Sequence, residues 1–220
     1  MPSLQLYSDS RLPCPQRVLV TAAEKGIDLE IIHTDVFAGE NKLPEFIKRQ
    51  PFGAIPVLVD RSDGVEFVLY ESRAISRYLA ALSNGAPQLV PNATDLRAVA
   101  RFEQAASIEV TGFDPFANRL VFEKIFKQQF AISAGDPLLI DSLTTQLAAK
   151  LDTINKILGQ QDYMAGMEFT VVDIFYMPYM SKLVEMDSSA MFLTRLHLKA
   201  WWDRIESRES YQRVFCSKSS

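Results

Sequence analysis

The residues with the clearest chemical potential are an acid and a hydroxyl side by side, Glu71 and Ser72. They follow the β-prone run 67–70 and open a segment whose apolar residues recur at intervals of three and four, as in a helix. Helix amino termini carry unpaired N–H groups and a positive partial charge. The pattern therefore predicts a site for a small anion, such as a carboxylate, at the start of this helix.

A proline ahead of this pair is the second feature. Pro56 follows the turn-forming Pro-Phe-Gly of residues 51–53 and precedes the β-prone run 57–59. Proline cannot donate to a sheet ladder, and its preceding peptide bond is the kind in which cis is accessible. A cis bond would turn the N–H and C=O of Ile55 outward, where they could pair with the backbone of a bound peptide. An ordinary turn entering a hairpin is the alternative.

Two stretches carry a family resemblance: residues 51–58, PFGAIPVL, and residues 69–80, LYESRAISRYLA. Together they resemble the glutathione-binding signature of the glutathione transferase superfamily, most closely its phi-type and related fungal members. The resemblance implies that Ile55, before a cis-proline, pairs with the cysteinyl backbone of glutathione. It also implies that Glu71 and Ser72 hold the γ-glutamyl amine and carboxylate.

The glycyl end of glutathione has its own candidates. In the relatives a His-Lys pair follows a Gly-Glu, and here Gly39-Glu40 is followed by Asn41 and Lys42. The resemblance implies that Lys42 pairs with the glycyl carboxylate and that Asn41 donates a hydrogen bond from its amide. An exposed loop face is the alternative for both residues.

Glutathione chemistry requires an ionised thiol, because the thiolate is the nucleophile. A thiol with a pKa of about 8.5 is only a few per cent ionised at pH 7, and lowering that pKa by about two units is worth about 2.7 kcal/mol. In phi-type relatives the hydrogen-bond donor is a serine five residues before the arginine of the first helix. Counting back from Arg17 gives Leu12, which has no donor. The sequence departs from the family here.

Three candidates for the thiol-activating group remain. Ser10 lies in the same loop and is the favoured catalytic residue, if the loop is rearranged. Cys14 is the alternative: its thiol stands at a helix start, although two positions beyond the nucleophilic cysteine of omega-type relatives. Ser8, which follows the strand and so lies deeper, is a third candidate. A site without a side-chain donor is the remaining interpretation. Ser10 as a plain turn residue and Cys14 as a small buried hydrophobe are the structural alternatives.

The resemblance implies a glutathione transferase that conjugates the thiolate of glutathione, as co-substrate, to small hydrophobic electrophiles in detoxification. A glutathione-binding ligand carrier or regulatory module with little conjugating activity is the alternative, as is an omega-like thiol transferase that uses Cys14. The resemblance also implies a homodimer, in which Phe52 is placed as an aromatic key.

The elements that position these residues form a β-α-β-α-β-β-α series over residues 1–83, which is the thioredoxin-like arrangement. Residues 84–92 break all periodicity and predict a linker, and residues 93–220 predict an all-helical domain. The apolar run 29–33 predicts a strand buried on both faces. Thr170 and Asp173 predict a capping box at the start of a helix, with about 1 kcal/mol lost on removal of the Thr170 cap.

Composition limits the function classes. The 220 residues carry a formal net charge of −4 and are 48% hydrophobic, which argues against nucleic acid as a partner and for a globular fold. No apolar run approaches the roughly 20 residues of a membrane span, and the amino terminus lacks a signal-peptide pattern. Two cysteines and two histidines predict neither a disulfide framework nor a metal site. A cytoplasmic protein is expected.

Overall fold

The computed structural model describes residues 4–82, 86–186, 191 and 194–216. The chain divides into two compact units, Met1–Val90 with Cys216–Ser220, and Pro91–Phe215. The break after Val90 lies within the predicted linker 84–92, of which residues 84 and 85 lie outside the described residues. The exact domain bounds stay a prediction.

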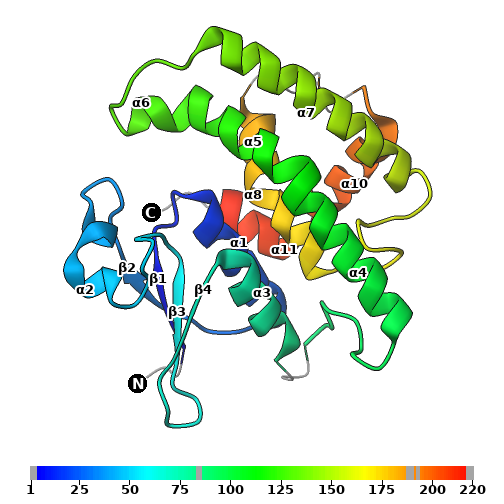
Figure 1. Ribbon diagram of the computed structural model, residues 1–220. Helices are drawn as coiled ribbons and strands as arrows, with labels where there is room; N and C mark the ends of the chain where they lie inside the picture. Colours follow the sequence, from blue (N-terminus) through cyan, green and yellow to red (C-terminus); the bar gives the residue numbers. More distant parts are fainter. Residues whose placement is uncertain (1–3, 83–85, 187–190, 192–193, 217–220) are drawn as a thin grey trace. The chain divides into compact units, whose positions relative to one another are not determined.

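The first unit is built on a four-stranded mixed sheet in the order β2-β1-β3-β4 (Figure 1). Strand β1 is parallel to β2 and antiparallel to β3, and β3 pairs with β4 as a hairpin. This is the predicted β-α-β-α-β-β-α order. Its elements are β1 (Leu4–Ser8), α1 (Pro13–Lys25), β2 (Glu30–His33), the short 3-10 helix η1 (Glu40–Lys42), α2 (Pro44–Ile47), β3 (Val57–Asp60), β4 (Phe67–Tyr70) and α3 (Ser72–Ala81).

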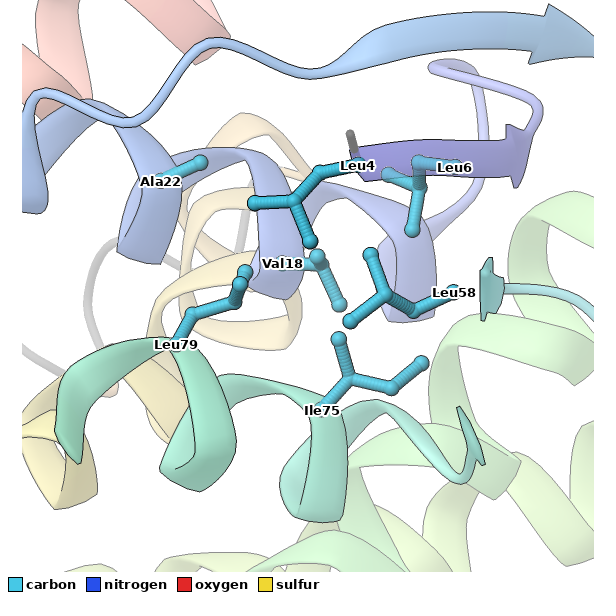
Figure 2. Close-up of a cluster of buried hydrophobic side chains, with 7 residues drawn as sticks. All are labelled: Leu4, Leu6, Val18, Ala22, Leu58, Ile75 and Leu79. Atoms are coloured by element: carbon cyan, nitrogen blue, oxygen red, sulfur yellow. The ribbon is translucent and has the colours of Figure 1, made fainter. Parts of the chain in front are cut away.

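Helices α1 and α3 pack against each other and against one face of the sheet. Between them lies a core of seven apolar side chains that come from β1, β3 and both helices (Figure 2). Alternate residues of β1 point into this core, as the strand period of two requires. Because α1 and α3 share this core, their amino termini are fixed relative to the sheet. The seven residues are Leu4, Leu6, Val18, Ala22, Leu58, Ile75 and Leu79.

Two local features of this unit compare differently with the sequence. Gly26 ends α1 in the left-handed conformation, at φ 59°, as its position after the last periodic residue predicts. Strand β2, however, is not buried on both faces. It is an edge strand, and Ile31 is 49% exposed. An apolar run shows which residue types a strand contains, but the burial of the strand depends on its position in the sheet.

The second unit is helical, and among its described residues the one β-pairing is an isolated bridge between Tyr163 and Gly166. Within the predicted all-helical domain, residues 96–129 form a helical run that contains two π-helical turns. Its elements are α4 (Leu96–Ile108), η2 (Glu109–Phe113), α5 (Asp114–Val121), η3 (Phe122–Phe126), α6 (Lys127–Gln129), α7 (Pro137–Leu158), α8 (Val171–Glu185), α10 (Leu196–Glu206), α11 (Glu209–Tyr211) and η4 (Gln212–Cys216).

The capping box at the start of α8 is confirmed. The Thr170 hydroxyl accepts a hydrogen bond from the N–H of Val172, and the Asp173 carboxylate accepts one from the N–H of Thr170. The same carboxylate is fully buried and also accepts a hydrogen bond from the indole N–H of Trp201 on α10. The capping box at the start of α8 therefore also holds α10 in place. Among the described residues, no helix is long and apolar enough to cross a membrane.

Candidate functional site

The turn before β3 contains a cis peptide bond between Ile55 and Pro56, one of the two forms that the sequence left open. Pro56 is buried and Ile55 is half-buried. Within the described part of the chain, neither the N–H nor the C=O of Ile55 has a hydrogen-bond partner. Both groups are therefore available to an extended ligand, which satisfies the geometric condition for the predicted backbone pairing.

Asn41 and Lys42 are brought to this turn by η1. The Asn41 amide and the Lys42 ammonium each donate a hydrogen bond to the carbonyl oxygen of Gly53, both at 2.7 Å. Lys42 also donates to the carbonyl oxygen of Phe52, at 3.2 Å. An ammonium has three donors, so one Lys42 N–H is left for a ligand. Asn41 is buried, and its side-chain oxygen has no partner among the described residues.

Gly53 must be a glycine for this turn to form. Its φ is 60°, and a Cβ there would lie 2.9 Å from atoms of Asn41, Ile47 and Lys42. We expect Gly53→Ala to lower the free energy of unfolding by about 2–5 kcal/mol, from the left-handed backbone and from overpacking together. Urea denaturation measures this. Gly64→Ala is the matched control, because Gly64 has φ 83° but open space around it, and equal losses in both variants would contradict the packing argument.

Glu71 and Ser72 lie at the amino terminus of α3. Glu71 has φ 71°, a conformation that costs a residue with a side chain about 1–3 kcal/mol and is often found at functional sites. Its side chain is exposed and does not cap the helix. The Ser72 hydroxyl is 5% exposed and accepts a hydrogen bond of 2.7 Å from Nη1 of Arg17, a fully buried side chain of α1.

The Arg17 contact determines the direction of the Ser72 hydroxyl. A guanidinium has donors only, so Ser72 is the acceptor in this bond and its own hydrogen must point elsewhere. The buried positive charge of Arg17 adds to the positive end of the α3 dipole. The arrangement favours a carboxylate that accepts from Ser72. Sequence reasoning used Arg17 only as a reference for counting and missed this contact.

Cys14 lies in the first turn of α1, a turn with few free backbone donors. Pro13 and Pro15 have no N–H, and Leu12 caps the helix without a side-chain hydrogen bond. The Cys14 thiol is half-buried, and its sulfur lies 3.8 Å from Nη1 of Arg17. Arg17 therefore reaches both Cys14 and Ser72, so the alternative catalytic residue and the predicted anion site share one cation.

The two serines of the loop after β1 differ in accessibility. Ser10 is exposed, and its carbonyl oxygen accepts a hydrogen bond from the Gln16 amide at 2.9 Å. Its hydroxyl makes no hydrogen bond to another candidate residue in the described part of the chain. Ser8 is 1% exposed, on the core-facing side of β1, and its hydroxyl has no described partner. Ser10 is the one of the two that a ligand in solvent can reach.

A charged network that sequence reasoning missed fixes this loop. Asp9, 1% exposed, accepts hydrogen bonds from the N–H of Arg11 at 3.1 Å and from its guanidinium at 2.8 and 2.5 Å. Burial by itself would raise the pKa of Asp9, but the bonds from Arg11 outweigh it and the pKa lies below its usual value. The acid and the arginine two positions apart, Asp9 and Arg11, were the signal in the sequence that could have indicated this network.

The depressed pKa of Asp9 makes a pH dependence predictable. Its ionised form is favoured in the folded state, so its contribution is present above the unfolded pKa near 4 and is lost as pH falls through the folded pKa. We expect Asp9→Asn to be less stable than wild type by about 1–3 kcal/mol at pH 7, with the difference shrinking below pH 4. Urea denaturation at pH 7, 5 and 3 tests this, and a constant difference would contradict it.

Comparisons with known proteins place the chain in a family. Residues 2–81 match the family model "Glutathione S-transferase, N-terminal domain", and residues 119–209 match "Glutathione S-transferase, C-terminal domain". Glutathione S-transferase PM239X14 of Arabidopsis thaliana is 39% identical over 92% of this chain and 91% of its own length. Glutathione S-transferase hmp2 of Hypomyces subiculosus is 34% identical over 89% and 90%. The crystal structure of glutathione transferase F7 from Populus trichocarpa superposes with a TM-score of 0.88 at 30% identity, over 96% of this chain and 97% of that one.

Proposed function

Because the chain belongs to the glutathione S-transferase family, we propose that it conjugates the thiolate of glutathione to small hydrophobic electrophiles. It is a transferase with glutathione as co-substrate. The thiolate attacks the electrophilic carbon, a carbon–sulfur bond forms, and the leaving group departs with the electron pair. The product is a thioether of glutathione.

The observation that carries the proposal is the Ser72 hydroxyl at the start of α3. It accepts from the buried Arg17 at 2.7 Å and must donate elsewhere. The adjacent Glu71 carboxylate is exposed. A γ-glutamyl group presents a carboxylate and an ammonium together, and these match a hydroxyl donor and a carboxylate acceptor. Ser72 holds the carboxylate, and Glu71 holds the amine.

The cysteinyl and glycyl parts of glutathione bind along the turn before β3. The unpaired backbone groups of Ile55 bind the cysteinyl backbone, and the third N–H of Lys42 binds the glycyl carboxylate. Asn41 acts differently from the sequence expectation in our proposal. Asn41 is buried, and one N–H of its amide donates to the Gly53 carbonyl, so we propose that it supports the turn on which Lys42 and the ligand lie.

Ser10 is the proposed donor to the thiolate, because its hydroxyl is exposed in the loop where a donor is required. Cys14 remains the specific alternative. Nη1 of Arg17 lies 3.8 Å from its sulfur, and a cysteine at this position would support thiol transfer through a mixed disulfide with glutathione. The two chemistries depend on different residues and are separable.

We propose a cytoplasmic homodimer. Phe52 supports the dimer: it is 72% exposed, at the tip of the turn that Lys42 and Asn41 hold. A large aromatic side chain held in water by a fixed turn is well suited to insert into a partner. Phe52→Ala separates dimerisation from glutathione binding. Sedimentation analysis of this variant should show the loss of the dimer.

The test is conjugation of glutathione to a chloronitrobenzene, followed by the absorbance of the product, in wild type, Ser10→Ala and Cys14→Ser. We expect an active wild type, a strong loss of rate in Ser10→Ala and little change in Cys14→Ser. If only Cys14→Ser loses activity, and the wild type reduces a disulfide substrate with glutathione, thiol transfer would replace conjugation as the proposed function. A wild type that binds glutathione without turnover would favour a ligand carrier.

A further inference from the structure

Arg11 joins two loops that the proposed function assigns to two parts of glutathione, its thiol and its glycyl carboxylate. The first loop connects β1 to α1 and contains Ser10. The second connects β2 to η1 and leads to Lys42. Arg11 Nη2 lies 2.5 Å from the Asp9 carboxylate of the first loop and 2.9 Å from the Asp35 carboxylate of the second. One guanidinium therefore spans both loops.

The second loop is itself closed around Asp35. The Asp35 carboxylate accepts hydrogen bonds from the N–H of Phe37 and of Ala38, at 2.9 and 3.2 Å. The hydrogen bond from Ala38 and the contact with Arg11 hold the pKa of Asp35 below its usual value. The Arg11 guanidinium also lies over the Phe37 ring, 4.4 Å from its centre.

The contacts continue from Asp35 to the glycyl end of the site. The N–H of Asp35 donates to the Glu40 carboxylate at 2.7 Å, and the N–H of Glu40 donates to the Asp35 carbonyl at 3.0 Å. Glu40 is the first residue of η1, which presents Lys42 to the Gly53 carbonyl. Hydrogen bonds thus join Arg11 to Glu40, and the short helix η1 connects Glu40 to Lys42, which bonds the turn that precedes Ile55.

We propose that Arg11 is a positioning residue for the transfer reaction, which sets the loop of the thiol donor in register with the loop that binds the glycyl carboxylate. This inference rests on the proposed function. Arg11 is suited to the task because a planar guanidinium offers five donors in fixed directions, so that two carboxylates and a ring determine its orientation. A lysine in its place would keep the charge but not these directions.

The consequence for glutathione is a coupling between its glycyl carboxylate and its thiol. With Arg11 intact, a ligand that is bound through its glycyl carboxylate meets the thiol donor at a fixed distance. Without it, each loop still folds but their spacing varies, so the hydrogen bond to the thiolate weakens. The effect should therefore appear in the ionisation of the bound thiol as well as in binding.

The experiment compares Arg11→Ala, Arg11→Lys and Asp35→Asn with Arg61→Ala. Arg61 is the matched control, because it also makes an ion pair of 2.5 Å and a second side-chain contact, but with Glu66 of the β3–β4 hairpin and with Gln5 of β1. Two quantities are measured: the dissociation constant of glutathione by calorimetry, and the pKa of the bound thiol from the ultraviolet absorbance of the thiolate. Urea denaturation confirms that each variant is folded.

We expect Arg11→Ala and Asp35→Asn to weaken glutathione binding about tenfold and to reduce the thiolate fraction at pH 7 about threefold. Arg11→Lys should recover little of either loss, and Arg61→Ala should stay within twofold of wild type. An unchanged thiol pKa in Arg11→Ala and Asp35→Asn, or full recovery in Arg11→Lys, would overturn the inference. Neither measurement needs turnover, so an inactive wild type would count against the proposed function alone.

Discussion

Ser72→Ala is expected to raise the KM for glutathione roughly 10- to 100-fold, with a much smaller change in the KM for the electrophile. The Ser72 hydroxyl accepts from Arg17, so its own hydrogen remains for a ligand. A hydrogen bond to a charged group contributes about 1.5–3 kcal/mol, which corresponds to that range of affinity. Alanine also leaves the Arg17 donor without its Ser72 acceptor, which adds to the loss. Steady-state kinetics with each substrate varied in turn measures the effect.

Ser76→Ala is the matched control for this variant. Ser76 is fully buried one turn further along α3, and its hydroxyl donates to the carbonyl oxygen of Arg17 at 3.5 Å. The substitution removes the same hydroxyl from the same helix, but away from its amino terminus. We expect the KM for glutathione of Ser76→Ala to stay within about twofold of wild type. Equal changes in both variants would mean that Ser72 acts through the packing of α3 and not through a ligand.

The largest effect on stability is expected for Asp173→Ala, which should lower the free energy of unfolding by about 3–5 kcal/mol. The carboxylate is fully buried and accepts hydrogen bonds from the N–H of Met164, the N–H of Thr170 and the indole of Trp201, each at 2.9 Å. Alanine leaves these donors buried without an acceptor. Urea denaturation followed by tryptophan fluorescence measures the loss directly, because Trp201 is one of the partners.

Two further variants separate the contributions of this carboxylate. Thr170→Ala removes the cap but leaves the Asp173 bonds to Met164 and Trp201, so its cost should be only about 1 kcal/mol. Asp173→Asn keeps one acceptor oxygen but turns an N–H₂ toward a donor, and should fall between the two alanine variants. A cost in Asp173→Ala no greater than in Thr170→Ala would show that the buried bonds contribute little beyond the helix cap.

The sequence by itself determined the local features of this protein. The helix-ending Gly26, the capping residues Thr170 and Asp173, and the hairpin before α3 could all be predicted from residues a few positions apart. These features depend on backbone geometry and on contacts within one or two turns, which the identity of neighbouring residues controls. The resemblance of residues 51–58 and 69–80 to one family has the same origin, because spacing and residue types along the chain define it.

The tertiary structure decided which residues that are far apart in the sequence contact each other. Arg17 and Ser72 are 55 positions apart, and Arg11 and Asp35 are 24 apart. The order of the strands places Ile31 on an exposed edge, and the turn at Gly53 engages the Asn41 amide that the sequence offered to a ligand. Each of these depends on which elements the core brings together. A side chain has many neighbours of suitable chemistry in the sequence, but packing of the sheet and its helices selects the one that it meets.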